Sequence, residues 1–234
     1  MPLAVLLAGG NGTRMGALVP KQFLLLSGKE IWAHTVQAFQ DTPCIDAIIL
    51  VCRKDFREHM AAGVLEHGFS KVAGIVEGGS ERYLSALNGI MSCDCAPDEK
   101  VLILDAVRPC IPMRVIEDVL LLLDRFDACD TGLPVVETLF EAENGRIAAI
   151  PERSRFYSGQ GPEGFRYGVV RKALAQYAES GGTSMTNISG IVHRCFPDMP
   201  IGLALGSERN IKITTPRDLL FAEQLLQSRD VGPI

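Results

Sequence analysis

The stretch Leu3-Ala-Val-Leu-Leu-Ala8, followed by Gly9-Gly-Asn-Gly-Thr-Arg14, decides the fold of this chain. Six apolar residues suffice for one buried strand, and the glycines after it let the backbone approach a ligand closely. Successive backbone N–H groups in such a turn form a concavity that binds anions. Arg14 and Lys21 are the only basic side chains in the first 28 residues. A buried strand that leads into a glycine-rich, dibasic loop favours a polyphosphate site.

Two common phosphate-binding motifs do not fit this loop. The P-loop requires Gly-x4-Gly-Lys-[Ser/Thr], which the loop lacks. A Gly-x-Gly-x-x-Gly motif that starts at Gly10 requires a third glycine at position 15, where the chain has Met15. The glycines alone leave a plain turn without a ligand as an open alternative. Arg14 and Lys21 argue against it, because they offer a planar fork and a compact charge to phosphate oxygens.

Composition narrows the class of protein. The chain has 234 residues, 47% of them hydrophobic, which fits one α/β domain over residues 1–234. A net charge of −5 argues against a nucleic-acid partner. The seven cysteines form no Cys-x-x-Cys pair, so we expect reduced thiols in a cytoplasmic protein. No signal peptide is recognised, and the later apolar run Val119–Leu123 is too short to span a membrane.

The first half of the chain alternates between strand and helix patterns. We expect strands at 46–52, 71–76 and 101–105, and helices at 30–39, 54–66, 80–91 and 112–126. This alternation predicts an α/β fold with a mostly parallel, twisted sheet flanked by helices in a Rossmann-like arrangement. Ligands of such sheets lie beyond the carboxyl ends of the strands. The glycine loop, Gly78-Gly79 and Asp105 all follow strands, so we expect them to converge on one crevice.

The second half of the chain is less regular. We expect strands at 130–136, 201–205 and 210–214, and helices at 165–178, at 216–226 and, capped by Thr183 or Ser184, up to Val192. Glu143-Asn-Gly-Arg146 is a good hairpin turn, because Asn-Gly tolerates positive φ at both central positions. A hairpin here would project from the domain as an arm at about 136–156.

Asp105 is the candidate metal ligand. A lone carboxylate at the end of a buried strand is costly without a cation. Mg²⁺ prefers one or two carboxylates together with substrate phosphates. Asp105 would therefore hold Mg²⁺ or another divalent cation, and a salt bridge from Asp105 to Arg108 is the alternative. Lys212 lies between β-branched neighbours in Asn210-Ile-Lys-Ile-Thr214, where a plain solvated lysine is the alternative to a functional one.

Several motifs resemble one family. The run from Gly9-Gly-x-Gly-Thr-Arg14 to Pro20-Lys-Gln-Phe23 resembles nucleotidyltransferases that activate sugar and polyol phosphates. The sequence Pro20-Lys-Gln-Phe23 is similar to the corresponding motif of the cytidylyltransferases that act on methylerythritol 4-phosphate or ribitol 5-phosphate. The resemblance covers nearly the whole chain but is weak in 137–190, and its motifs lie at 8–23, 78–85, 105–109 and 210–219.

The resemblance implies a reaction, a site and an assembly. CMP would pass from CTP to a polyol or sugar phosphate, and pyrophosphate would leave. The implied catalytic residues are Arg14, Lys21 and Lys212. The implied nucleotide-binding residues are Ala8, Gly9, Gly10, Gly12, Gly79, Ser80 and Ser85, while Arg82 is as consistent with a structural role. The implied acceptor-binding residues are Arg108, Thr138 and Arg153, with Arg155 as an alternative to Arg153. A homodimer through the arm is expected.

Departures from the family pattern leave the acceptor open. Leu104 stands where the family has His, and Asn187-Ile188 stands where it has two acidic residues. Gln160-Gly-Pro-Glu163-Gly-Phe165 resembles Gln-Thr-Pro-Gln-x-Phe. Gly9 and Val107 favour a ribitol-phosphate enzyme of cell-envelope polymer synthesis. The alternatives are methylerythritol-phosphate cytidylyltransferase of isoprenoid synthesis and an inactive nucleotide-binding protein, against which the set of cations and Asp105 argues.

Overall fold

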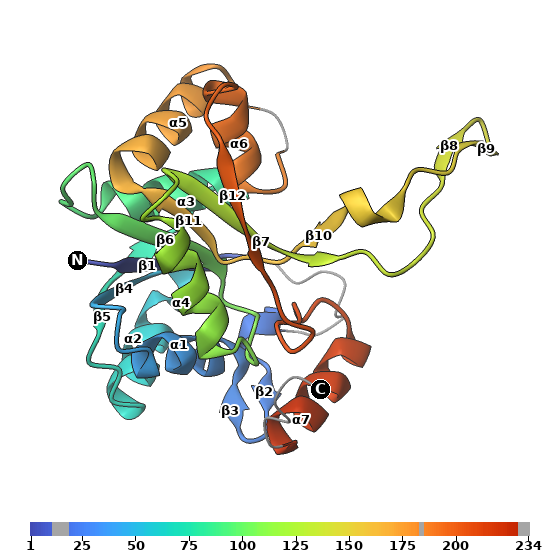
Figure 1. Cartoon of the computed structure of the whole chain (residues 1–234). Coiled ribbons are helices and arrows are strands. Elements are labelled where there is room, and N and C mark those ends of the chain that lie inside the picture. Colours follow the sequence, from blue (N-terminus) through green and yellow to red (C-terminus); the bar gives the residue numbers. More distant parts are fainter. Residues whose placement is uncertain (11–18, 183–184, 229–234) are drawn as a thin grey trace.

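The computed structural model describes residues 1–10, 19–182 and 185–228 (Figure 1). Within these residues the main sheet has eight strands, and those of its strands that precede β7 in the chain pair with one another in parallel. The strands are, in spatial order, β10 (Tyr157–Gly159), β7 (Ala128–Pro134), β11 (Glu163–Arg166), β6 (Lys100–Asp105), β1 (Leu3–Ala8), β4 (Ala47–Cys52) and β5 (Val72–Glu77), with β12 (Ile201–Leu205) paired in parallel to β7. The predicted fold class is confirmed.

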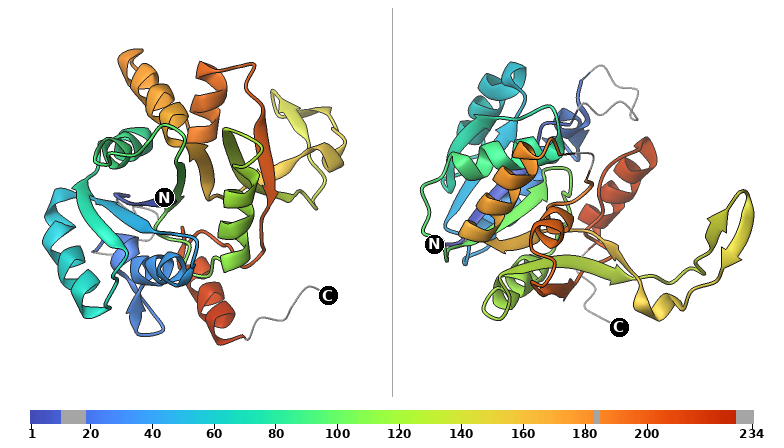
Figure 2. Two further views of the ribbon diagram at one scale, coloured as in Figure 1. Left: turned by 60° about the vertical axis from the view of Figure 1, so that its left-hand side comes forward. Right: turned by 90° about the horizontal axis from the view of Figure 1, so that it is seen from above.

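Helices cover both faces of this sheet (Figure 2). One apolar layer joins the sheet to α1 (Ile31–Asp41), α2 (Arg57–Glu66) and α4 (Met113–Leu122). The other joins it to α3 (Arg82–Met91), α5 (Tyr167–Glu179) and α6 (Ile188–Cys195). Every residue of β1 and β4 is buried, as their continuous apolar runs predict for strands covered on both sides. The sheet thus holds the carboxyl ends of β1, β5 and β6 in fixed positions.

A smaller layer closes one end of the molecule. It contains α7 (Pro216–Gln227) and the short hairpin of β2 (Leu25–Leu26) and β3 (Lys29–Glu30), which follows the 3₁₀ turn Lys21–Phe23 and which the sequence did not predict. Thr215 and Asp218 form a reciprocal capping box at the start of α7. None of the helices in the described ranges is both long and apolar enough to cross a membrane.

The helix predicted at 165–178 is present as α5, but it begins at Tyr167. Residues 163–166 form β11, a strand that the sequence did not predict, which pairs antiparallel with β6 and β7. The strand predicted at 210–214 is wrong. Residues 210–214 form no strand. The segment pairs with none of the strands in the described residues. Two separate hydrogen bonds hold it instead: Ile213 N donates to Val107 O (2.9 Å), and the Asn210 side chain donates to Gly161 O (2.6 Å).

The start of α6 also differs from the prediction. The predicted caps, Thr183 and Ser184, lie outside the described residues, and α6 begins at Ile188 after Asn187. The side chain of Asn187 makes no capping bond of its own. The N–H groups of Ile188 and Ser189 instead donate to the carboxylate of Glu163.

The arm projects away from the sheet, as expected (Figure 1). Its tip is the hairpin of β8 (Glu141–Glu143) and β9 (Arg146–Ala149). Asn144 and Gly145 both have positive φ, 50° and 75°, which confirms the predicted turn. The chain then returns through a 3₁₀ turn at Arg153–Arg155 to β10, which pairs with β7.

Candidate functional site

A cavity of about 320 Å³ opens at the carboxyl ends of β1, β5 and β6. This is the edge of the sheet at which the sequence predicts a ligand. Its walls are formed by Leu7, Ala8, Gly9, Gly10, Lys21, Gln22, Gly79, Ser80, Glu81, Arg82, Ser85, Asp105, Val107, Lys212 and Thr214. The structure therefore brings together most of the residues that the sequence selected. Gly12 and Arg14 lie outside the described residues.

Lys21 and the first glycine loop are held by a residue whose role the sequence did not reveal. Gln22 is 1% exposed, and its side-chain amide donates to the carbonyl oxygens of Ala8 (2.6 Å) and Gly10 (3.0 Å). Lys21 Nζ donates to Ile213 O at 2.7 Å, next to Lys212 in the chain. Gln22 thus ties the 3₁₀ turn to the end of β1 and brings the Lys21 side chain to the cavity.

Ser85 braces the second glycine loop. Its Oγ accepts a hydrogen bond from Gly79 N (3.1 Å) and donates to Gly79 O (3.3 Å). A Cβ at position 79 would lie 2.3 Å from Leu84 Cβ, so glycine is required where the loop touches the first turn of α3. Ser85 is only 5% exposed, and its hydroxyl is used by the two hydrogen bonds with Gly79. Ser80 and the Gly79 backbone remain at the cavity wall.

Asp105 lies between two cations at the end of β6. Its Oδ1 accepts from Arg82 Nε at 2.9 Å, and its Oδ2 accepts from Lys212 Nζ. Burial alone would raise the pKa of this carboxyl, but Arg82 and Lys212 hold the pKa well below its usual range. The expected alternative, a salt bridge to Arg108, is wrong, because Arg82 and Lys212 occupy that role.

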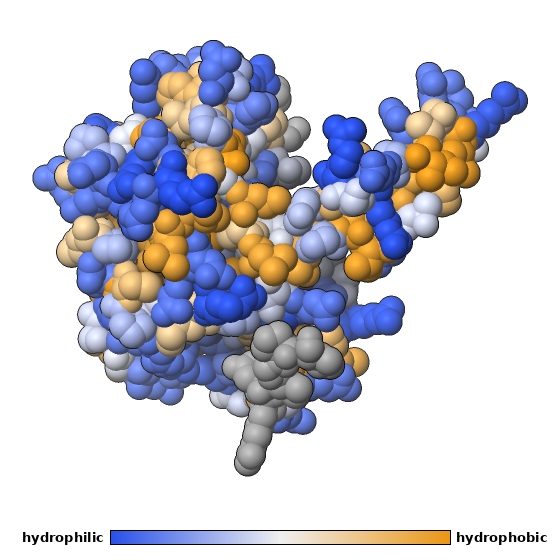
Figure 3. Space-filling view, viewed as in Figure 1, coloured by the Kyte–Doolittle hydropathy of each residue, from blue (hydrophilic) through white to orange (hydrophobic). Residues whose placement is uncertain are grey.

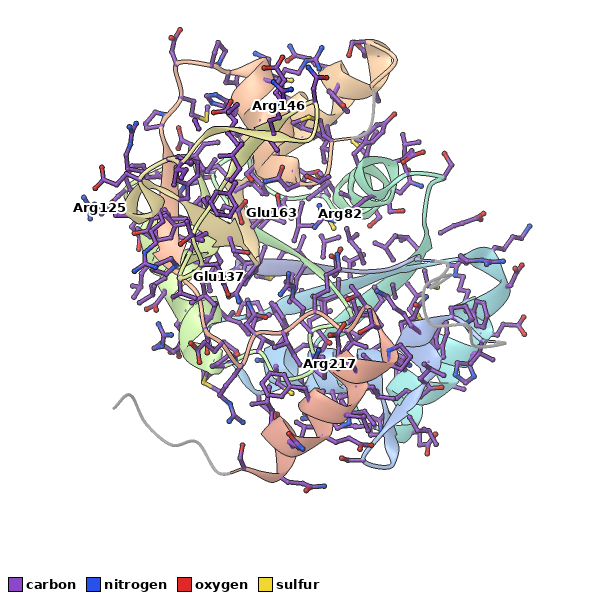
Figure 4. The ribbon with its side chains drawn as sticks, turned by 90° about the vertical axis from the view of Figure 1, so that its right-hand side faces the viewer. Arg82, Arg125, Glu137, Arg146, Glu163 and Arg217 are labelled. Atoms are coloured by element: carbon purple, nitrogen blue, oxygen red, sulfur yellow. The ribbon has the colours of Figure 1, made fainter. Side chains whose placement is uncertain are left out.

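Arg82 belongs to a larger polar network. Its Nη2 donates to Glu163 Oε1 at 2.8 Å, and Figure 4 shows the two side chains close together in the middle of the molecule. Burial would lower the pKa of Arg82, but Glu163 and Asp105 raise it above its ordinary value. Arg82 is therefore charged and joins β11 to the cavity.

A second carboxylate lies behind Glu163. Asp130 accepts hydrogen bonds from Thr131 N (2.7 Å), from Asn187 Nδ2 (3.2 Å) and from Ser189 Oγ. Burial raises the pKa of Asp130, and burial together with the Asp130 charge raises that of Glu163, which Arg82 opposes. Because every hydrogen-bond partner of the Glu163 oxygens is a donor, the geometry is that of an ionised carboxylate.

The predicted acceptor residues are not brought to the cavity. Arg108 is 7% exposed, and its Nη1 donates to Asn210 O at 2.6 Å, so it secures the segment that carries Lys212. Thr138 and Arg153 lie exposed on the arm, where Arg153 Nη1 donates to Val136 O at 2.5 Å. Leu104 is 1% exposed, packs in the sheet core and does not line the cavity.

The residues present fit a divalent cation that is shared with a substrate. Each oxygen of Asp105 uses one lone pair for its present partner and keeps a second one. No group of three or more His, Cys, Asp or Glu side chains that could hold a metal is found among the described residues. A single carboxylate with phosphate oxygens completing the coordination is the arrangement that Mg²⁺ commonly adopts.

Comparison with known proteins yields one consistent group. A family model described as 2-C-methyl-D-erythritol 4-phosphate cytidylyltransferase matches residues 3–228. A bifunctional ribulose 5-phosphate reductase/CDP-ribitol pyrophosphorylase of Haemophilus influenzae is 38% identical over 97% of this chain, which spans only 48% of that relative. A 2-C-methyl-D-erythritol 4-phosphate cytidylyltransferase of Geotalea uraniireducens is 38% identical over 96% of both chains. The solved 4-diphosphocytidyl-2C-methyl-D-erythritol synthase of Anaerococcus prevotii matches with a TM-score of 0.84 and 27% identity, over 97% of this chain and 96% of that chain.

Proposed function

Because the chain belongs to the 2-C-methyl-D-erythritol 4-phosphate cytidylyltransferase family, we propose that it transfers CMP from CTP to a phosphorylated polyol of the ribitol 5-phosphate type. It is a nucleotidyltransferase, and cytidylyl transfer is common to the family and to the named relatives. The observation that carries the proposal is the convergence of both glycine loops, Lys21, Asp105 and Lys212 on one cavity.

The cavity supports an in-line displacement at the α-phosphorus of CTP. A phosphate oxygen of the acceptor forms the new P–O bond, and the bond between the α-phosphorus and the bridging oxygen of the β-phosphate breaks. The attacking oxygen already carries charge at neutral pH, so no general base is required. The reaction requires two anions to come together, and positioned cations reduce the repulsion between them.

The side chains have distinct tasks in this proposal. Lys21, together with Arg14 from outside the described residues, holds the β- and γ-phosphates and the departing pyrophosphate. Lys212 stabilises the charge that develops at the α-phosphorus. Ser80 and the Gly79 backbone contact the nucleoside. Asp105 is the residue that would hold Mg²⁺, which supplies neutralisation of phosphate charge when bound.

The choice of acceptor rests on few residues. Gly9 lies at the cavity, and Val107 follows Asp105 at the same edge. Both favour the ribitol-phosphate branch, as does the similarity to the CDP-ribitol pyrophosphorylase. The alternative acceptor, 2-C-methyl-D-erythritol 4-phosphate, is favoured by the family model and by the Geotalea relative.

We further propose a cytoplasmic homodimer that forms through the arm. Large apolar side chains on the arm are exposed, namely Val136, Phe140, Ile147, Ile150 and Phe156. Figure 3 shows apolar surface near the base and near the tip of the arm. An apolar projection of this kind is typical of a protein–protein contact. Arg153 and Thr138 of one subunit would then reach the acceptor in the cavity of the other.

One assay tests the reaction and the acceptor. The purified protein is incubated with CTP, Mg²⁺ and either ribitol 5-phosphate, 2-C-methyl-D-erythritol 4-phosphate or another polyol phosphate, and pyrophosphate release is measured. Release with ribitol 5-phosphate alone supports the proposal, whereas release with the methylerythritol compound alone assigns the other branch. Tight CTP binding without release for any acceptor would support an inactive nucleotide-binding protein. ATP, GTP and UTP serve as controls for the base.

Subunit complementation tests the dimer. Lys212→Ala and Arg153→Ala are each expected to inactivate the enzyme. Mixed dimers of the two variants contain one site with neither substitution if Arg153 acts across the interface, so activity should return on mixing. A monomer in sedimentation equilibrium, or no recovery in mixtures, would contradict the proposed assembly.

A further inference from the structure

We propose that Glu163 is a positioning residue for this reaction: it holds the Arg82 guanidinium and the first turn of α6 together, and thereby sets Asp105 at the cavity wall. The inference rests on the proposed transfer of CMP. Glu163 itself does not line the cavity. Arg82 does line the cavity, so any effect of Glu163 on the reaction has to pass through Arg82.

The placement of Glu163 is unusual for a carboxylate. It begins β11, opposite Ile103 of β6, and is 3% exposed. A charge so far from water is costly unless several donors surround it. Oε1 accepts from Arg82 Nη2 (2.8 Å), and Oε2 accepts from Ile188 N (2.5 Å) and Ser189 N (2.7 Å). Each oxygen thus serves a different element, with α3 on one side and α6 on the other.

The Arg82 guanidinium connects Glu163 to Asp105 at the cavity. Arg82 Nη2 lies on Glu163, while Nε of the same rigid plane lies 2.9 Å from Asp105 Oδ1. Because the guanidinium is planar, fixing one edge on Glu163 orients the edge that faces Asp105. The buried Nη1 has no hydrogen-bond partner among the residues that the structure describes, so these two carboxylates supply its orientation.

Asp105 in turn meets the second cation. Its other oxygen contacts Lys212, which also lines the cavity. An uninterrupted chain of polar contacts therefore runs from the N-terminus of α6 through Glu163, Arg82 and Asp105 to Lys212. Asp130 lies next to Glu163 but is bound by Thr131, Asn187 and Ser189, and does not share the Arg82 contact.

Glutamine stands at this position in the motif that the stretch resembles, but in this chain a neutral amide cannot replace the carboxylate at both contacts. Glu163→Gln has one acceptor oxygen and one NH₂ group, so either the α6 amides or Arg82 would face a donor. If Glu163 only stabilised the fold, any substitution that restored stability would also restore kcat. A positioning Glu163 requires the carboxylate because it directs the charge of Arg82 towards Asp105.

The experiment compares Glu163→Gln with the doubly neutral variant Arg82→Met/Glu163→Gln. We expect Glu163→Gln to lower kcat by about 10- to 100-fold, the usual cost of removing a residue that orients a site ligand. The dissociation constant of CTP, measured by calorimetry, should change less than kcat. Removing both charges should recover part of the stability in urea, since a buried ion pair tolerates joint replacement. The kcat should nevertheless stay low.

Glu30→Gln is the matched control. Glu30 is a half-buried carboxylate that accepts from two side chains, Trp32 Nε1 (2.5 Å) and His59 Nε2 (2.8 Å), and it lies outside the cavity. Its kcat should equal that of the unmodified protein. If Glu163→Gln does not fold, Arg82→Lys replaces it, because one ammonium group cannot span both carboxylates and the same fall in kcat is expected.

The outcomes separate this inference from the proposed function. A kcat for Glu163→Gln, or for Arg82→Lys in its place, that matches the unmodified enzyme overturns the positioning role while the proposed function stands. Recovery of kcat together with stability in the double variant also overturns it, because it assigns Glu163 to folding alone. An unmodified protein that releases no pyrophosphate with any acceptor removes both proposals.

Discussion

Replacing Lys212 by methionine should abolish most turnover while leaving the protein folded. Lys212 Nζ contacts Asp105, and the lysine side chain is 38% exposed at the cavity wall. Water screens a pair this exposed, so its contribution to folding is about 0–1 kcal/mol. Asp105 keeps its contact with Arg82 in the variant. Methionine preserves most of the aliphatic packing, and the free energy of unfolding should therefore change little.

The effect on the reaction is much larger than the effect on folding. Removing one positioned group that stabilises developing charge commonly costs about 100- to 1,000-fold in kcat, or about 2.7–4 kcal/mol. We expect a loss of this size for Lys212→Met in pyrophosphate release. The dissociation constant of CTP should change less, since the proposed nucleotide contacts of Lys21 and the glycine loops remain in place.

Lys100→Met is the control for this variant. Lys100 begins the strand that Asp105 ends, and its Nζ forms an ion pair with Asp124 at 2.6 Å. It lies outside the cavity, so its removal should leave kcat unchanged. Two results would refute the argument for Lys212. One is a kcat within about threefold of the unmodified enzyme. The other is a loss of activity matched by an equal loss of folded protein in circular dichroism.

The remaining predictions concern stability and the second glycine loop. Gly89→Ala should destabilise the fold by about 1–3 kcal/mol in urea, because the new Cβ would lie 2.5 Å from Val5 Cγ1; an equally stable variant would contradict this packing. Ser85→Ala should weaken CTP binding, measured by calorimetry, by about 1–2 kcal/mol, because Gly79 N loses its partner; unchanged affinity would show that the loop holds without Ser85. Partial burial would raise the pKa of Asp218, but hydrogen bonds from the neighbouring threonines lower this pKa in the folded protein. Asp218 therefore stabilises α7 fully above the unfolded pKa of about 3.9. This stabilisation is lost as the pH falls through the lower pKa of the folded state. The difference in stability between Asp218→Asn and the unmodified protein should thus shrink on acidification, and a constant difference would refute this.

Prediction from sequence succeeded where local pattern and topology agree. The apolar runs of β1 and β4 are buried on both faces, and such runs have few alternatives to a parallel strand. The convergence of the glycine loops with Asp105 followed from the parallel order alone, since all three follow strand ends. Neither inference required knowledge of any side-chain contact.

Prediction failed where distant partners decide the structure. Glu163–Arg166 has no strand period and contains a glycine, and only its pairing with β6 and β7 makes it a strand. Residues 210–214 alternate like a strand but pair with none of the strands in the described residues. The choice between Arg82 and Arg108 as partner of Asp105 likewise depends on which side chain the fold directs to the cavity. Local sequence carries no signal for it.

The pairing of β7 with β10 has an evolutionary consequence. Pro134 and Tyr157 are register partners, so the arm leaves the sheet and re-enters it at the same point. Everything between them can be lengthened, shortened or exchanged without moving a strand of the sheet that carries the cavity. The arm is therefore an interchangeable module: residues 135–156 can diverge between lineages while the sheet, and the cavity at its edge, are inherited intact.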